Sequence, residues 1–138
     1  MVRDCSQTFS KKIHVLQDRK TGSKASVKID NKNEEEFTVI EFDGCLILNK
    51  TACDYVVTHK TKVIYVELKG SDIRKAHTQI VIAVDHYKKA HGGLSKTGII
   101  AFTGNPKEST YIQIQKVKLR KSHQLKMICT RSPVTHQI

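Results

Sequence analysis

The chain has 138 residues, which is the size of one domain and is long enough to bury a hydrophobic core. No apolar run approaches the ~18 residues of a transmembrane helix, and the first residues lack the apolar segment of a secretory signal, so we expect a cytoplasmic protein. The formal net charge is +11 and the pI is near 9.6. Such an excess predicts a polyanionic partner, most simply nucleic acid, although a merely soluble basic protein is the alternative.

The four cysteines, at positions 5, 45, 53 and 129, are scattered along the chain. They form no CxxC pair, which argues against a zinc site. Cys45 and Cys53 lie in strand-like runs, so we interpret them as buried free thiols. We expect no disulfide framework, because the sequence shows no sign of a secreted protein.

The first half of the chain reads as a meander of short strands joined by tight turns. The Asp43-Gly44 pair is typical of a hairpin turn, and it predicts that the strands on either side of it pair with each other. The predicted strands are residues 27–30, 37–42, 45–48, 53–57 and 63–69.

The period of the pattern then changes, because apolar residues repeat at helical spacing between residues 73 and 87. Ser71 is a suitable N-cap for this helix, and Gly92 is a suitable end. The next apolar run, residues 98–104, is a predicted strand. A strand, a helix and a strand in this order form a crossover, so residues 63–69 and 98–104 should pair in parallel.

Residues 111–121 alternate between apolar and polar and read as a long strand with a bulge. A last strand is predicted at 125–129, and residues 130–138 are expected to be a flexible tail. We therefore predict an α/β (α+β) domain with a central mixed sheet, antiparallel hairpins, one long crossover helix and flanking helices. Residues 1–138 would form one domain, with its core between residues 27 and 121.

Asp54, Glu67 and Lys69 are the residues that point most directly to chemistry. Glu67 and Lys69 are two residues apart, so they share one face of a strand. If residues 59–62 form a hairpin loop, Asp54 pairs with Glu67 and two carboxylates stand side by side. Like charges opposite each other destabilise a sheet, so this arrangement indicates a divalent metal between the carboxylates.

The other face of the same strand is apolar, so we expect Glu67 and Lys69 to point outward or into a cleft. The alternative interpretation is an exposed face on which Lys69 forms salt bridges with Asp54 or Glu67. Exposed pairs of this kind contribute only about 0–1 kcal/mol, so stability alone gives little reason for them.

A metal at this place fits phosphodiester hydrolysis. Mg²⁺, or Mn²⁺ in its place, could be bound by Asp54 and Glu67 with the backbone carbonyl of Leu68 as a third oxygen. Lys69 could orient or deprotonate the attacking water. Gln79, on the following helix, could reach a phosphate or a water near the site.

Asp54, the Glu-x-Lys triplet that ends at Lys69 and the glutamine of the next helix together resemble the PD-(D/E)XK nuclease superfamily. The resemblance covers roughly residues 38–104. It implies a restriction-endonuclease-like core, a mixed sheet flanked by helices with the acid–x–lysine motif on the middle strand of a hairpin. It also implies Mg²⁺-dependent cleavage of DNA that leaves a 5′-phosphate and a 3′-hydroxyl.

By this resemblance, Asp54 and Glu67 are the two acids of the motif, Lys69 is its lysine and Gln79 is the helix glutamine of some members. Cys53 stands where the motif has its proline. Many members also present a glutamate to the metal from an N-terminal helix. The upstream acids that could take that place are Glu34, Glu35, Glu36 and Glu41.

The predicted strand at 111–121 would place Lys116, Lys118 and Arg120 on one face, as a row of phosphate contacts. The alternative is an edge strand that lysines protect from aggregation. With about 6 phosphate contacts, affinity for DNA should fall ~10³-fold between about 50 and 200 mM salt.

Two functions from different classes follow from these observations. The first is a metal-dependent endonuclease in a restriction, repair or recombination system, acting as a homodimer because one site cuts one strand. The second is a non-catalytic nucleic-acid-binding module, or a subunit of a larger nucleoprotein assembly.

Overall fold

The computed structural model describes residues 5–17, 24–42, 45 and 53–138. In this part of the chain the fold is α+β, with two helices, a six-stranded mixed sheet of order β1-β4-β5-β6-β7-β8 and a three-stranded mixed sheet of order β2-β3-β9. The elements are β1 Ser6–Phe9, β2 Ile13–Gln17, β3 Ser26–Asp30, β4 Phe37–Glu41, β5 Tyr55–His59, β6 Lys62–Lys69, α1 Ile73–His86, β7 Ser95–Phe102, α2 Ser109–His123, β8 Leu125–Arg131 and β9 Val134–Gln137.

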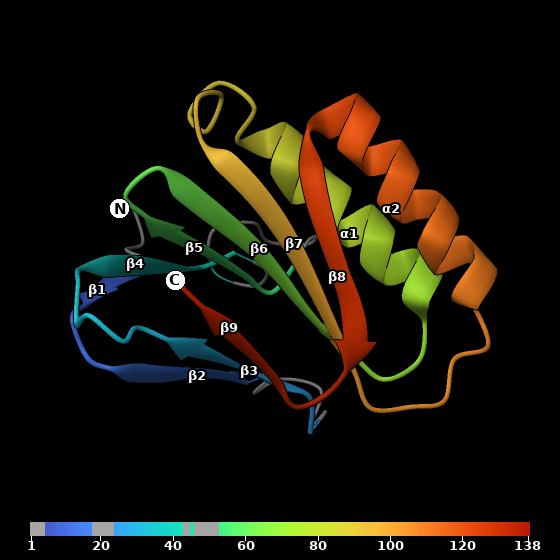
Figure 1. Cartoon of the computed structure of the whole chain (residues 1–138), viewed down its shortest axis with the longest axis horizontal. Helices are drawn as coiled ribbons and strands as arrows, with labels where there is room; N and C mark the ends of the chain where they lie inside the picture. Colours follow the sequence, from blue (N-terminus) through green and yellow to red (C-terminus); the bar gives the residue numbers. More distant parts are fainter. Residues whose placement is uncertain (1–4, 18–23, 43–44, 46–52) are drawn as a thin grey trace.

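The elements form three layers (Figure 1). Helices α1 and α2 cover one face of the six-stranded sheet, and the three-stranded sheet covers the other face. Strands β4, β5 and β6 are antiparallel neighbours, whereas β6, β7 and β8 are parallel and are connected through α1 and α2. The predicted mixed sheet and the predicted parallel pairing of β6 with β7 are confirmed.

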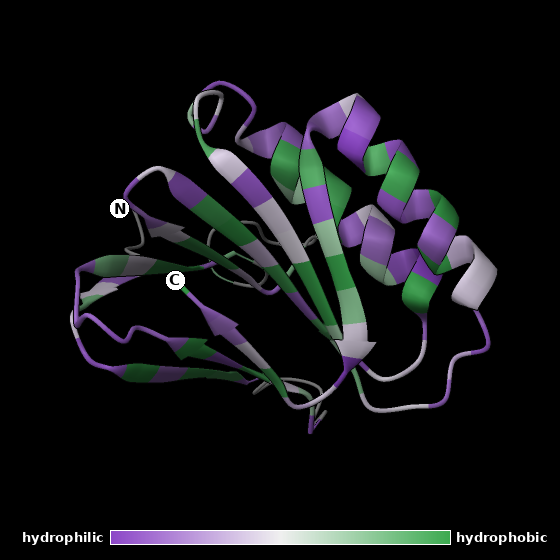
Figure 2. Cartoon of the chain, viewed as in Figure 1, coloured by the Kyte–Doolittle hydropathy of each residue, from purple (hydrophilic) through white to green (hydrophobic). Residues whose placement is uncertain are grey.

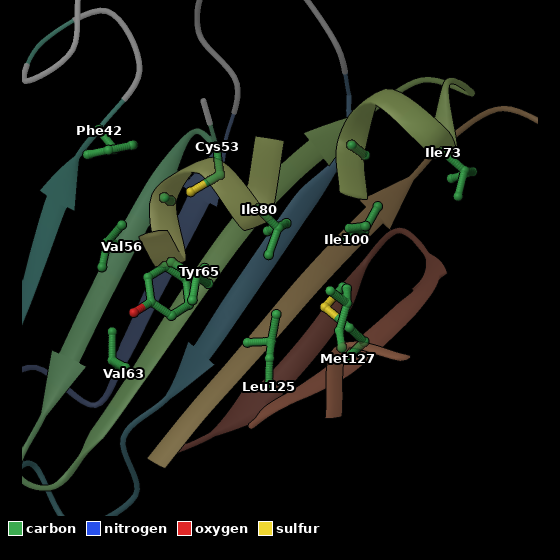
Figure 3. Close-up of a cluster of buried hydrophobic side chains, with 14 residues drawn as sticks. Phe42, Cys53, Val56, Val63, Tyr65, Ile73, Ile80, Ile100, Leu125 and Met127 are labelled. Carbon is green, nitrogen blue, oxygen red and sulfur yellow. The ribbon is translucent and has the colours of Figure 1, made fainter. Parts of the chain in front are cut away.

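Strand β6 is buried on both faces because both outer layers cover it. Tyr65 points into the cluster between the sheet and the helices (Figure 3), whereas Ile64 and Val66 pack against the three-stranded sheet. Strands covered on both sides read as continuous apolar runs, as this one does. We expected Glu67 and Lys69 to point outward or into a cleft, and the outward alternative is wrong for Glu67, since only 2% of it is exposed.

Helix α1 begins one residue later than the sequence suggested. Asp72 is the N-cap, and its side chain accepts a hydrogen bond from the backbone N–H of Lys75 at 3.1 Å. The helix then packs Ile80 and the rest of its apolar stripe on the sheet, and it ends at His86. The predicted N-cap at Ser71 was therefore one residue early, and the predicted end at Gly92 was six residues late.

The prediction of a strand at residues 111–121 is wrong, because these residues form most of α2. Hydrophobic and hydrophilic residues alternate along this helix (Figure 2), and Leu119 is its buried residue. On a helix, Lys116 and Arg120 share a face, whereas Lys118 lies about 200° around the axis from Lys116. The prediction that the three side chains lie on one face is therefore also wrong, whereas their contact with phosphate stays a prediction.

Residues 130–138, expected to be a flexible tail, instead complete β8 and form β9. Strand β9 pairs in parallel with β3, and Val134 joins the core between the two sheets. Neither described helix has the length and apolar character needed to cross a membrane.

The cysteines differ in part from the prediction. Cys5 and Cys45 form a disulfide, so the expectation of a free thiol at Cys45 is wrong. Cys53 is a buried free thiol, as expected, and Cys129 is also free. The predicted Asp43-Gly44 turn and the predicted strand after Cys45 lie outside the described residues.

Candidate active site

The hairpin of β5 and β6 brings Asp54 beside Glu67. The strands are joined by a turn at residues 60–61, and Tyr55 pairs with Val66. The same register, extended by one residue, places Asp54 opposite Glu67. This is the alignment that the sequence predicted, and a short turn is sufficient to set it.

The two carboxyl groups are in contact. Asp54 Oδ2 accepts a hydrogen bond from the backbone N–H of Leu68 at 2.9 Å, which orients the aspartate. Burial raises the pKa of Glu67 most, the negative charge of Asp54 raises it further, and Lys69 opposes both effects. The result is a pKa of about 9 for Glu67, so this carboxyl is protonated at neutral pH and shares a hydrogen bond with Asp54.

Lys69 lies on the same face of β6 as Glu67. Its Nζ lies 3.4 Å from Glu67 Oε2, and it donates a hydrogen bond to Gln79 Oε1 at 2.9 Å. Gln79 projects from α1 and is only 5% exposed. The structure thus brings Asp54, Glu67, Lys69 and Gln79 together, while their roles remain predictions.

The residues present fit a divalent cation. Glu67 Oε1 is buried and has no hydrogen-bond partner among the described residues, and such atoms normally have one. A cation here would contact this oxygen and would stabilise the charged form of Glu67 in place of the proton.

The described residues contain no group of three or more His, Cys, Asp or Glu side chains that could hold a metal. Asp54 and Glu67 would therefore be the acidic ligands in this part of the chain, with the carbonyl of Leu68 as a possible third oxygen. Mg²⁺ suits such a small ligand set, because it is commonly bound through one or two carboxylates and completes its shell with water or substrate phosphate.

The glutamates at residues 34–36 do not join this site. Glu35 forms ion pairs with His59 and Lys60, at the turn end of the β5–β6 hairpin. Asp54 lies at the opposite end of β5.

Glu41 is closer along the sheet but faces the wrong way. It pairs with Tyr55, and both residues line a hollow between the two sheets. Glu67 lies on the other face, toward the helices. The described residues therefore supply no upstream glutamate to the two carboxyl groups.

The loops after β6 and β7 fix the backbone at Lys69, which sequence reasoning missed. The N–H of Thr103 donates to Lys69 O at 3.1 Å, and the N–H of Gly104 donates to Gly70 O at 2.6 Å. Arg131 Nη1 donates to the carbonyls of Thr103 and Gly104 at 3.1 and 2.7 Å. The Thr-Gly-Asn-Pro sequence indicated a turn, but only the parallel pairing of β6, β7 and β8 reveals this contact.

Comparison with known proteins adds no assignment, because no family model, curated protein or solved structure matches the chain. The interpretation therefore depends on the geometry around Glu67: a buried carboxyl in contact with a second acid, with a lysine that a helix glutamine orients.

Proposed function

We propose that this protein is a Mg²⁺-dependent endonuclease that hydrolyses DNA phosphodiester bonds and leaves a 5′-phosphate and a 3′-hydroxyl. The observation that carries the proposal is the contact between the carboxyl groups of Asp54 and Glu67, with Lys69 beside them. Burial of an acid pair is unfavourable unless a proton or a cation reduces its charge. A site for a divalent cation accounts for this arrangement better than a structural ion pair does.

The surroundings of the site support the resemblance to the PD-(D/E)XK superfamily. The Glu-x-Lys triplet lies on β6, in the middle of a mixed sheet, and β6 forms a hairpin with β5. Helix α1 follows directly and contributes Gln79. A restriction-endonuclease-like core is therefore part of the proposal, with a three-stranded sheet on the face away from the helices.

In the proposed reaction, Mg²⁺ would stabilise negative charge on the scissile phosphate and lower the pKa of the attacking water. Asp54 and Glu67 would hold the ion, with the Leu68 carbonyl. Lys69, oriented by Gln79, would position the water and accept its proton. The water oxygen bonds to phosphorus while the bond to O3′ breaks, and the leaving oxygen takes a proton from solvent.

A plasmid-nicking assay tests this function. We expect nicking with Mg²⁺ or Mn²⁺, none with EDTA, and a loss of ~10²-fold or more in Lys69→Ala, because general acid–base groups contribute that much. Lys28→Ala is the matched control, since Lys28 is exposed on β3. Full nicking by Asp54→Asn or Glu67→Gln would show that these residues are not the metal ligands.

A non-catalytic nucleic-acid-binding module is the second candidate. The exposure of the two side chains favours it, because Glu67 is only 2% exposed and Lys69 is 21% exposed. The lysine could therefore contact a phosphate while the acid stays covered. DNA binding by wild-type protein with no nicking under any metal would support this alternative. The homodimer remains a proposal tied to duplex cleavage, and the molar mass in solution tests it.

A further inference from the structure

A basic hollow lies where the C-terminal ends of α1 and α2 meet the beginnings of β7 and β8. It consists of two adjoining cavities of about 310 and 340 Å³ that share Lys96 and Gln124. Asp85 is the carboxylate in its described lining. The cationic side chains that line it are Lys88, Lys96, Arg120, Lys121 and Lys126.

The basic hollow and the candidate active site lie at opposite ends of the parallel strands β6 and β7. In the parallel pairing of β6 with β7, Lys69 is opposite Phe102 at one end, and Lys62 is opposite Ser95 at the other. Lys96 follows Ser95, so it lies near the end of β7 that is away from Lys69. A ligand of the hollow would therefore not occupy the place between the two carboxyl groups.

Lys96 is a buried cation in this hollow, and its ammonium group lacks an anionic partner among the ion pairs of the described residues. It is only 9% exposed, and its Nζ donates to the carbonyl of Leu94 at 3.3 Å. An ammonium group has three N–H donors, and buried charges are normally paired. Among the ion pairs of the described residues, none includes Lys96. Its charge also acts on its neighbour, since burial first and Lys96 second lower the pKa of His91.

Part of the positive charge has a partner inside the protein. Each helix C-terminus carries about half a negative charge, so the two helix ends offset about one cation. Asp85, whose Oδ1 lies 3.3 Å from His123 Nε2, offsets at most one more. Most of the positive charge in the basic hollow is thus left uncompensated, which favours an anion from outside.

We propose that the basic hollow binds phosphate groups of a nucleic acid strand. The proposal rests on the nucleic-acid partner of the proposed function. It adds a second contact surface at the end of the parallel strands that is away from Lys69. Phosphate oxygens would accept hydrogen bonds from Lys96, with Lys88 and Lys121 at the rim. The described lining contains no Phe, Tyr or Trp, so the contact would be with the backbone and independent of base sequence.

The test is the salt dependence of DNA binding by the full chain in EDTA, measured by fluorescence anisotropy with a short labelled duplex. Lys88→Gln/Lys121→Gln removes two charges from the rim, and Lys28→Gln/Lys32→Gln removes two from exposed positions outside the hollow. We expect the rim variant alone to lower the slope of log affinity against log salt by about 2, because each phosphate contact contributes about 0.9.

A third variant, Lys96→Met, keeps an unbranched side chain that is one atom shorter and removes the buried charge. We expect weaker binding together with unchanged or higher stability, because an unpaired buried charge is removed. If the Lys96→Met protein does not fold, the salt dependence of the rim variant still tests whether the basic hollow binds phosphate. Equal slopes for the rim variant and its control would overturn the proposal.

Failure of this proposal can be distinguished from failure of the endonuclease. Wild-type nicking combined with equal slopes would overturn the basic hollow and leave the endonuclease in place. Absence of nicking combined with a smaller slope in the rim variant alone would overturn the endonuclease and support phosphate binding in the basic hollow.

Discussion

Glu67 combines an acidic group with an almost completely buried position. Its environment raises its pKa to about 9, so without a metal the site carries a proton that Glu67 shares with Asp54. A divalent cation in the same place would favour the ionised form. The proposed metal would therefore compete with a proton for one pair of carboxyl groups, and this competition would have measurable consequences.

The first consequence is a pH-dependent stability of the metal-free protein. The unfolded chain releases the Glu67 proton at a pKa of about 4.3, whereas the folded protein keeps it up to a pKa of about 9. The folded state binds more protons in this window, so its free energy of unfolding should decrease as pH rises, by up to about 1.4 kcal/mol per pH unit. Urea unfolding in EDTA across this range measures the slope.

Glu67→Gln keeps the shape of the side chain and removes the titration, so most of this slope should disappear. Glu36→Gln is the matched control, because Glu36 is exposed. An equally pH-dependent Glu67→Gln protein would contradict the assignment of the slope to Glu67.

The second consequence is that metal binding should release a proton. At neutral pH, binding of Mn²⁺ between Asp54 and Glu67 should displace about one proton, since the bound form of Glu67 is ionised. Calorimetric titration in two buffers with different ionisation enthalpies measures this number. In Glu67→Gln we expect weaker binding and no released proton, whereas Glu36→Gln should behave as wild type.

At the scale of elements, the close contact between the loops after β6 and β7 positions Lys69. A Cβ atom added to Gly104 would lie 2.7 Å from Gly70 O and 2.8 Å from Ser71 Cβ. Gly104→Ala should therefore displace Gly70 and the adjacent Lys69, lower nicking activity and reduce stability by about 1–3 kcal/mol.

Gly93→Ala is the matched control for this change. A Cβ atom at Gly93 would meet nothing within 4 Å, so stability and nicking should be close to wild type. Thermal unfolding and plasmid nicking of both variants give the comparison. Normal nicking by a well-folded Gly104→Ala protein would show that this loop does not position Lys69.

The elements around the site could be predicted because their signals are local. The short turn at residues 60–61 fixes the hairpin register that places Asp54 opposite Glu67. The apolar stripe of α1 and the parallel pairing of β7 followed from periodicity and from the crossover rule. The contact between Lys69 and Gln79 depended only on β6 and on the helix α1 that follows it.

Helix α2 could not be recognised in the same way. Its sequence alternates between apolar and polar residues as a half-buried strand does, and Ile114 and Val117 are both largely exposed. Packing decides instead, since Leu119 and the partly buried Tyr111 and Ile112 face the core at helical spacing. The burial of Glu67 was missed for a related reason, because the helices cover the face of β6 that Glu67 shares with Tyr65, and the sequence pattern did not show that α2 is one of them.

For the molecule as a whole, the disulfide Cys5–Cys45 joins positions 40 residues apart. Closing a loop of this length restricts the unfolded chain, and its reduction should lower the free energy of unfolding by about 4 kcal/mol. Denaturant unfolding with and without a reducing agent measures the difference. A Cys5→Ser/Cys45→Ser protein should be insensitive to the reducing agent, and a drop of equal size in that variant would point to a different cause.

The same bridge bears on where the protein works. Structural disulfides are uncommon in cytosolic proteins, so the bridge does not favour the cytoplasmic location that the sequence predicts. That location stays a prediction, and cell fractionation with thiol labelling of the purified protein tests it.

The pairing of β3 with β9 joins segments from distant parts of the chain, since Val27 lies opposite Val134. On the ribosome, the hairpin of β2 and β3 emerges long before β9 does. Until then, one edge of the small sheet lacks its neighbour, and nascent chains could associate through it. Synthesis therefore includes an interval in which a chaperone that shields open strand edges would raise the yield of native protein.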